Sequence, residues 1–360
     1  MPESLSSYER ITRALRHQEA DRVPLTETFV WPDTYQRWKK EGFPADGDVV
    51  EYFALDRITC GGGFDSSLKA VFPHIVFEET DEYIIDQNNF GVKVKYFKNR
   101  FVTHVELDHA VKEYADWKKI KHHLAVSDDR LVDTGAERTK ARQRGDFVAL
   151  NIVDPFWFSF VMLGMENLMI QMAGDPEFIE DIYATYTDLM MAMVEKIAAT
   201  GTPWDCVWFF SDMAYRNGPM FSPAFYDRYL LPHHKRMSDY CRGRGKFLFL
   251  HSDGNIEKLI PGLIKAGFDA LQPLEARAGN DVRVYKPLYG KDVCFFGNIS
   301  ADILAEGRKE KIEEEIRSKL TVAKRGGGYI YHNDHSIPPT VSLENYRFAI
   351  ECAKKYGKQG

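Results

Sequence analysis

The feature that most constrains the fold is a series of six short apolar runs from residue 147 onward. They read FVALNIVD, CVWFFSD, KFLFLHSD, FDALQPLE, VCFFGNIS and GYIYHND, and a stretch long enough for a helix separates each run from the next. Nearly continuous apolar strands alternate with helices when a parallel sheet is covered on both faces. This part of the chain therefore predicts a β/α architecture.

Two further strands are expected near the N-terminus, at 22–30 and 53–65, which brings the predicted total to eight. Eight β/α units in a chain of 360 residues fit a (β/α)8 TIM barrel. A doubly wound open sheet is the alternative, but it usually carries a GxGxxG fingerprint, which the GGG at 61–63 does not match. We expect a single α/β TIM-barrel domain over 1–360.

The pattern changes between the second and third predicted strands. The stretch IVFEETDEYIIDQNNFGVKVKYFKNRFVTHVEL alternates apolar and polar residues, which is typical of half-exposed antiparallel strands, and QNNFG is turn-forming. A charged helical stretch follows it. We expect a β-hairpin-containing insertion at 66–146, which could be a substrate lid, a dimer contact or a docking surface.

Residues that can ionise, hydrogen-bond or bind a metal stand at the ends of all six later strands. They are Asp154, Asp212, His251 with Asp253, Glu275, Asn298, and Asp334 with His335. The active site of a TIM barrel lies at the carboxyl ends of its strands. We therefore expect these side chains to meet at the barrel mouth, with Pro338 and Pro339 stiffening the turn behind the last pair.

Each of these residues also has a structural interpretation. His251 could cap a helix or hold a backbone carbonyl, and Asp253 could be a turn residue. Asp154 and Asp212 could anchor neighbouring loops, and His332 is expected to have a structural role.

Aromatic residues follow two of the predicted strands. Trp157 and Phe158 come directly after the third strand, and Trp31 comes after the first. Ligand pockets are lined mainly by apolar and aromatic side chains, so these three could wall a substrate site. The alternative is that they fill the core.

Composition excludes several other classes of protein. The net charge of −6 gives no basic excess for nucleic-acid binding. The five cysteines form no CxxC pair, which argues against a disulfide framework and a cysteine-only zinc site. No apolar run approaches the roughly 20 residues that span a bilayer, and the N-terminus lacks the apolar core of a signal peptide. We expect a reduced, cytoplasmic, globular protein.

Several ordered motifs resemble the uroporphyrinogen decarboxylase superfamily. They are SYERITRALRHQEADRVPL, SDMAYRNGPMFSPAFYDRYLLPHHKRM, LHSDGNIEKLIPGLIKAGFDALQPLE, FFGNISADILAEG and GGYIYHNDHSIPPTVSLENYRFAIECAKKYG. The resemblance covers about three quarters of the chain. It implies a TIM barrel, often a homodimer, and one of two chemistries.

The chain departs from the decarboxylase branch of this superfamily. True uroporphyrinogen decarboxylases bind a tetrapyrrole rich in carboxylates through an arginine-rich RQAGRY loop. Here the corresponding stretch reads ETFVWPDTYQRWKK, with Arg37 as its one arginine, so a polyanionic substrate would lack paired guanidinium partners. Asp56, in ALDRIT, comes nearest to the decarboxylase aspartate.

The chain resembles the corrinoid-dependent methyltransferase and O-demethylase branch more closely. That branch binds zinc through His-x-Cys after the fifth strand and a Cys after the eighth. His251, Asp253 and His335 occupy these places here, with Glu275 between them. The resemblance implies a zinc site of His251, Glu275 and His335, with Asp253 in reserve. Nitrogen and oxygen ligands would suit activation of an oxygen leaving group.

We therefore expect a zinc-dependent methyltransferase that moves a methyl group from a small methoxylated or methylated compound to a corrinoid on a partner protein. Asp212 or Asp334 would orient a histidine or handle a proton. The alternative is a metal-independent decarboxylase of a small carboxylated or tetrapyrrole substrate. In that case Asp56, Asp154 or Asp212 would donate the proton, and His335 would bind a carboxylate. A non-catalytic corrinoid carrier is a third class, but it would need a DxHxxG-like motif, which the sequence lacks.

Overall fold

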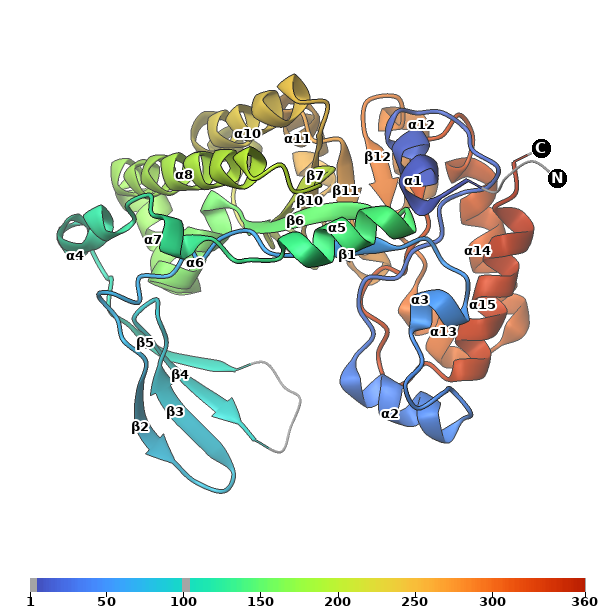
Figure 1. Ribbon diagram of the computed structural model, residues 1–360, viewed down its shortest axis with the longest axis horizontal. Helices are drawn as coiled ribbons and strands as arrows, with labels where there is room; N and C mark the ends of the chain where they lie inside the picture. Colours follow the sequence, from blue (N-terminus) through green and yellow to red (C-terminus); the bar gives the residue numbers. More distant parts are fainter. Residues whose placement is uncertain (1–4, 99–103, 360) are drawn as a thin grey trace.

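The computed structural model describes residues 5–98 and 104–359, and its centre is a seven-stranded parallel sheet (Figure 1). In sheet order the strands are β1 (Ile58–Cys60), β6 (Phe147–Val153), β7 (Cys206–Phe210), β10 (Phe247–His251), β11 (Ala270–Gln272), β12 (Cys294–Phe296) and β13 (Tyr329–Ile330). Strands that follow one another in this list are neighbours in the sheet, and every pairing is parallel. The sheet curls in the manner of a TIM barrel, and the six apolar runs from residue 147 supply its strands β6 to β13.

The segment predicted as the first strand, 22–30, is held by single bridges instead of a regular ladder. Leu25 bridges Tyr331 next to β13, and the amide of Asp56, just before β1, donates to the carbonyl of Leu25 at 2.6 Å. The segment therefore lies between the last and the first strand of the sheet.

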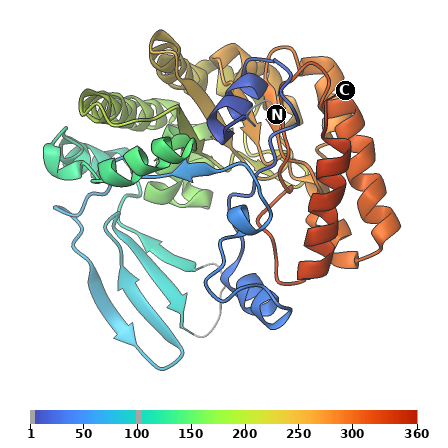
Figure 2. The same cartoon turned by 45° about the vertical axis from the view of Figure 1, so that its right-hand side comes forward.

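Apolar side chains cover both faces of the sheet. On the inner face, Phe147, Trp208, Phe249 and Phe296 form one cluster, which Ile11 and its neighbours on helix α1 (Ser7–Leu15) extend. A larger cluster packs the outer face against the helices. Two views place these helices around the sheet (Figures 1 and 2). Their bounds are α5 (Gly135–Arg144), α8 (Pro176–Ala199), α10 (Leu231–Gly243), α11 (Ile260–Ala266), α12 (Val282–Tyr289), α14 (Lys309–Ala323) and α15 (Leu343–Tyr356).

The other helices and strands outside the two main sheets lie in the connections. They are α2 (Pro32–Lys40), α3 (Val49–Tyr52), α4 (Tyr114–Ile120), α6 (Pro155–Leu163), α7 (Met165–Gly174), β8 (Ala214–Tyr215), β9 (Gly218–Pro219), α9 (Pro223–Phe225) and α13 (Ala301–Glu306). Within the described ranges, no helix combines the length and the apolar character needed to cross a bilayer.

A separate antiparallel sheet lies between β1 and β6 in the chain. Its strands are, in order, β2 (Ile75–Glu79), β3 (Tyr83–Gln87), β4 (Val92–Phe97) and β5 (Val105–His109). The alternating sequence pattern predicted antiparallel strands here, although residues 99–103 of the expected insertion lie outside the described ranges. The antiparallel sheet and α2 extend from the same side of the parallel sheet, opposite to α1 (Figures 1 and 2). The limits 66–146 for one insertion stay a prediction.

Candidate functional site

A cavity of about 450 Å³ opens at the carboxyl ends of the parallel strands. Its walls are largely aromatic, with two separate groups of polar side chains. The lining residues are Thr28, Phe29, Cys60, Asn151, Trp208, Phe209, Phe210, His251, Asp253, Gln272, Pro273, His332, His335 and Ser336. An apolar cavity with a few convergent polar groups is the usual form of a small-molecule site.

The first polar group comes from the ends of two neighbouring strands. β7 and β10 pair in parallel with His251 opposite Phe210, so the residues that follow them, Asp212 and Asp253, emerge side by side. The Nε2 atom of His251 lies 3.5 Å from Oδ1 of Asp212 and 4.0 Å from Oδ1 of Asp253. The amide of Asp253 donates to Oδ1 of Asp212 at 3.0 Å, which ties the two loops together.

The orientation of His251 is fixed from two directions. Its Nδ1 lies 2.5 Å from the side-chain oxygen of Gln272 and donates to it. Its ring stacks on Phe210 with the centroids 4.8 Å apart. These contacts direct Nε2 of His251 towards the two aspartates.

His335 joins this group through Asp253. Its Nε2 lies 3.3 Å from Oδ2 of Asp253. The hydrogen bond with Asp253 raises the pKa of His335 above its ordinary value, against the effect of burial. Burial works to raise the pKa of Asp253, but the hydrogen bond with His335 and the nearby histidine charges outweigh it, so that pKa is lowered. Burial and the charge of Asp253 raise the pKa of Asp212, against the effect of His251.

One oxygen in this group is buried without a protein partner. Oδ1 of Asp253 accepts no hydrogen bond from any described residue. A ligand atom from each of Asp212, His251 and Asp253 lies within 4.8 Å of the other two. Two carboxylates and an imidazole at this spacing could hold a divalent metal ion.

Glu275 does not join this group. Its Oε2 accepts from the amide of Gly254 at 2.8 Å, and its Oε1 pairs with Arg277. Both carboxylate oxygens are therefore in use. Glu275 lines a second hollow of about 420 Å³, on the other side of Asp253.

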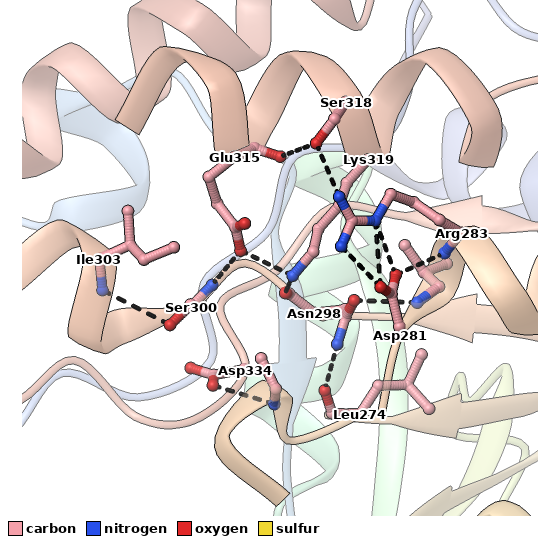
Figure 3. Close-up of polar contacts among 12 residues, drawn as sticks. Leu274, Asp281, Arg283, Asn298, Ser300, Ile303, Glu315, Ser318, Lys319 and Asp334 are labelled. Carbon is pink, nitrogen blue, oxygen red and sulfur yellow. Dashed lines mark hydrogen bonds and ion pairs between the residues drawn. The ribbon is translucent and has the colours of Figure 1, made fainter. Parts of the chain in front are cut away.

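Asp334 is buried below the mouth, where it clamps two loops (Figure 3). Its two oxygens accept from the amides of Ala301 and Ala276, at 2.9 and 3.0 Å. Burial raises its pKa, against the effect of these amides.

The same view shows a buried ion pair that supports the ends of β11 and β12 (Figure 3). Nζ of Lys319 lies 2.6 Å from Oε1 of Glu315, which accepts from the amide of Ser300 at 2.9 Å. Lys319 also donates to the carbonyl of Asn298, whose amide side chain reaches the carbonyl of Leu274 at 2.6 Å. Asn298, the predicted seventh strand-end residue, thus joins two loops and does not line the cavity.

Asp154 is fully buried away from the cavity. One oxygen caps helix α6 by accepting from the amide of Trp157 at 2.7 Å, and the other lies 2.9 Å from Nε2 of His234. The opposite nitrogen of His234 lies 3.0 Å from the hydroxyl of Tyr226. This chain of bonds joins α6 to α10.

The three predicted aromatic wall residues lie outside the cavity lining. Trp157 stacks on Phe160 and meets the edge of Phe210, so it supports the cavity wall from behind. Phe158 is fully buried in the core. Trp31 occupies the N-cap position of α2.

Asp56 also lies outside the cavity lining. It is buried between Arg10 and Arg22, each 2.5 Å away, and it accepts from the amide of Leu25 at 2.8 Å. Both oxygens of Asp56 are therefore engaged by these structural contacts.

Sequence reasoning missed the second polar group of the cavity, which contains Thr28 and His332. Glu27 and Thr28 lie inside the first predicted strand, 22–30, and His332 stands before the residues taken as the end of the last one, so the strand-end rule did not select them. Asn151 and Gln272 project from within strands and carried no such signal.

Comparisons with known proteins agree on the family. The model of the family Uroporphyrinogen decarboxylase (URO-D) matches residues 87–356. The uroporphyrinogen decarboxylase of Syntrophotalea carbinolica is 27% identical over 147 residues, which cover 38% of this chain and 39% of the relative. That of Pelobacter propionicus is 22% identical over 201 residues, 53% of this chain and 56% of the relative. The matched segments thus span less than two thirds of these relatives.

The fold also matches a solved structure along almost its whole length. A methyltransferase from Methanosarcina mazei superposes with a TM-score of 0.68, covering 98% of this chain and 99% of that one. Sequence identity is 15%, so this likeness is one of fold.

Proposed function

We propose that this chain, which belongs to the uroporphyrinogen decarboxylase family, is a zinc-dependent methyltransferase acting on a small methoxylated or methylated compound. A corrinoid on a partner protein would accept the methyl group. The observation that carries the proposal is the convergence of Asp212, His251, Asp253 and His335 at one edge of an apolar cavity.

The donor atoms of this group fit a metal ion. Nε2 of His251 faces both aspartates, and Oδ1 of Asp253 is buried with no hydrogen-bond partner among the described residues. Buried polar atoms normally have hydrogen-bond partners, so an oxygen without one beside an imidazole nitrogen supports a role as a metal ligand. Two imidazoles and one or two carboxylates form a ligand set that zinc accepts.

The proposed ligand set differs in one member from the set that the sequence suggested. Asp212 takes the place of Glu275, because both oxygens of Glu275 are already bonded to Gly254 and Arg277. We assign to Glu275 the role of holding the loop that carries Asp253. Groups that orient metal ligands in this way tune the site without touching the metal.

A bound zinc would supply Lewis-acid activation of the oxygen that carries the methyl group. In the proposed reaction the carbon–oxygen bond would break, the oxygen would keep the electron pair and take up a proton, and the methyl carbon would pass to the reduced corrinoid of the partner protein. Phe29, Phe209 and Phe210 would supply an apolar wall beside the reacting group.

The main alternative is decarboxylation, which is the activity named for the curated relatives. A tetrapyrrole with many carboxylates requires cationic partners. No lysine or arginine stands among the described residues that line the cavity. The composition of the cavity therefore favours a small, weakly charged substrate.

The test is the metal content of untagged protein purified without chelator and then offered zinc. We expect about one zinc per chain in the wild type, as for a single mononuclear site. His251→Ala and Asp253→Asn should lose it. His74→Ala removes a histidine that also pairs with an aspartate, Asp86, but in the antiparallel sheet, and it should retain the zinc. A wild type without zinc, or a full complement in both site variants, would contradict the proposal.

A further inference from the structure

The second polar group of the cavity has its hydrogen-bond directions fixed. Nδ1 of His332 lies 2.6 Å from the carbonyl of Asn333, which can only accept, so Nδ1 carries the hydrogen and Nε2 carries the lone pair. The hydroxyl of Thr28 lies 2.8 Å from this Nε2 and must donate to it. The amide of Thr28 points to the same nitrogen, at 3.2 Å.

This arrangement decides what the cavity can offer a ligand. The hydrogen of the Thr28 hydroxyl is committed to His332, and the lone pair of His332 is occupied. The oxygen of Thr28 still has acceptor capacity, and both side chains line the cavity. The group can therefore accept a hydrogen bond from a ligand but has no free donor for one.

Glu27 holds this arrangement from behind. Its Oε1 accepts from the amides of Thr28 and Phe29, at 3.1 and 3.4 Å, and lies 3.3 Å from Nε2 of His332. Its Oε2 accepts from the side-chain amide of Asn333 at 2.6 Å and lies 3.3 Å from the hydroxyl of Tyr346. One carboxyl group thus connects the first segment, the end of β13 and helix α15.

The group is uncharged near neutral pH. Burial raises the pKa of Glu27 to about 8, against the four hydrogen-bonding partners around it. The hydroxyl of Tyr346, 3.3 Å from Oε2, can accept the hydrogen of the neutral carboxyl. Burial lowers the pKa of His332 to about 4. A neutral, aromatic-walled acceptor is suited to a neutral donor, because a buried cation would need a compensating negative charge.

We propose that Thr28 and His332, positioned by Glu27, form a binding subsite for a hydroxyl group of the substrate. The substrate would then have an apolar body, a hydroxyl at this subsite and its reacting group near Asp253. The nature of the reacting group rests on the proposed function. The hydroxyl subsite rests on the contacts of Thr28, His332 and Glu27 alone.

The test is ligand binding to chelator-treated protein, without zinc or corrinoid, so that it does not depend on the proposed function. The probes are the three methoxyphenol isomers and methoxybenzene, and the signal is the fluorescence of the protein, in which Trp208 lines the cavity. At least one isomer should bind about 10-fold more tightly than methoxybenzene, since a made hydrogen bond is worth on the order of 1 kcal/mol or more.

Two variants at one position separate the hydroxyl from the shape of the side chain. Thr28→Val keeps the volume and loses the hydroxyl, so the preference for methoxyphenol should disappear while methoxybenzene binds as before. Thr28→Ser keeps the hydroxyl and should keep the preference. Equal binding of all four probes to the wild type, or an unchanged preference in Thr28→Val, would overturn the proposal.

The role of Glu27 has a separate readout. Nitrogen chemical shifts of His332 should report an unprotonated Nε2 at neutral pH in the wild type. Glu27→Gln should weaken the preference for methoxyphenol and shift the tautomer equilibrium of His332. A protonated Nε2 in the wild type would reverse the hydrogen-bond directions and overturn the subsite.

Discussion

The buried carboxyl of Glu27 makes a quantitative prediction about stability against pH. Its pKa is raised from 4.5 to about 8 in the folded protein. Between these values the unfolded chain has released the proton that the folded protein keeps. Stability therefore falls as pH rises from 4.5 to about 8 and does not fall further above that. Glu27→Gln removes this titration while keeping an acceptor and the shape of the side chain.

The useful window lies above pH 6.5. His332 has a lowered pKa of about 4 against an ordinary 6.5, so its contribution to stability is lost as pH falls through that range. Below pH 6.5, a falling pH therefore raises the contribution of Glu27 to stability and lowers that of His332. The window from pH 6.5 to 8 is about 1.5 pH units wide. At about 1.36 kcal/mol per unit, the titration of Glu27 should lower the free energy of unfolding by on the order of 2 kcal/mol across it.

The assay is urea unfolding of the wild type and Glu27→Gln at several pH values across this window. The free energy of unfolding of the variant, relative to that of the wild type, should rise by about 2 kcal/mol between pH 6.5 and 8. His335, whose pKa is also raised, loses its stabilising contribution with rising pH in both proteins and cancels in the difference.

The control is Glu313→Gln, an exposed carboxyl whose hydrogen bonds with Lys355 and Tyr356 lower its pKa. Glu313 is fully ionised throughout the window. The difference in unfolding free energy between Glu313→Gln and the wild type should therefore stay constant with pH. If the difference in unfolding free energy between Glu27→Gln and the wild type also stayed constant with pH, the account of a buried, neutral Glu27 would be refuted.

Three further predictions concern the mouth and its supports. Asp154→Ala removes the cap of α6 and the partner of buried His234, and should destabilise the protein by about 3–5 kcal/mol in urea unfolding. Asp253→Asn should lower the NMR titration midpoint of His335 in chelator-treated protein, because Asp253 is the main cause of its raised pKa. Gly254→Ala should cost at least about 1 kcal/mol by thermal unfolding and lower zinc content, because its φ is +80° and a Cβ there would lie 2.3 Å from the carbonyl of Ala214.

The pattern of apolar runs was sufficient to predict the parallel sheet from β6 to β13. Continuous apolar strands must be covered on both faces, and this requirement is visible in sequence. The rule that strand ends form the mouth selected His251, Asp253, His335 and Asp212, which lie next to one another in the structure. Whether these four residues bind zinc stays a prediction.

The roles of other strand-end residues depend on partners that are remote in sequence. His234 stands 80 positions from Asp154 and engages it in the core. Asp334 is occupied by backbone amides from two other loops. Sequence gives the position of a carboxylate along the chain, but not which donor reaches it.

The second polar group was missed for a different physical reason. Glu27 and Thr28 lie on a segment that forms single bridges, so its apolar pattern is short and interrupted. The raised pKa of Glu27 results from burial by Tyr346, Asn333 and their neighbours, which come together only in the fold. The polar triplet TET at 26–28 therefore gave no sign in the sequence that its glutamate is buried.

Methyl transfer to free cob(I)alamin is the measurement that tests the central claim most directly. Zinc-loaded protein would be mixed with a methoxyphenol and cob(I)alamin, and methylcobalamin followed by its absorbance, with His251→Ala as the matched control. The account predicts methylcobalamin with the wild type and none above background with the variant. Formation at the same rate in both proteins, or no methylcobalamin from zinc-loaded wild type with any methoxyphenol isomer, would contradict it.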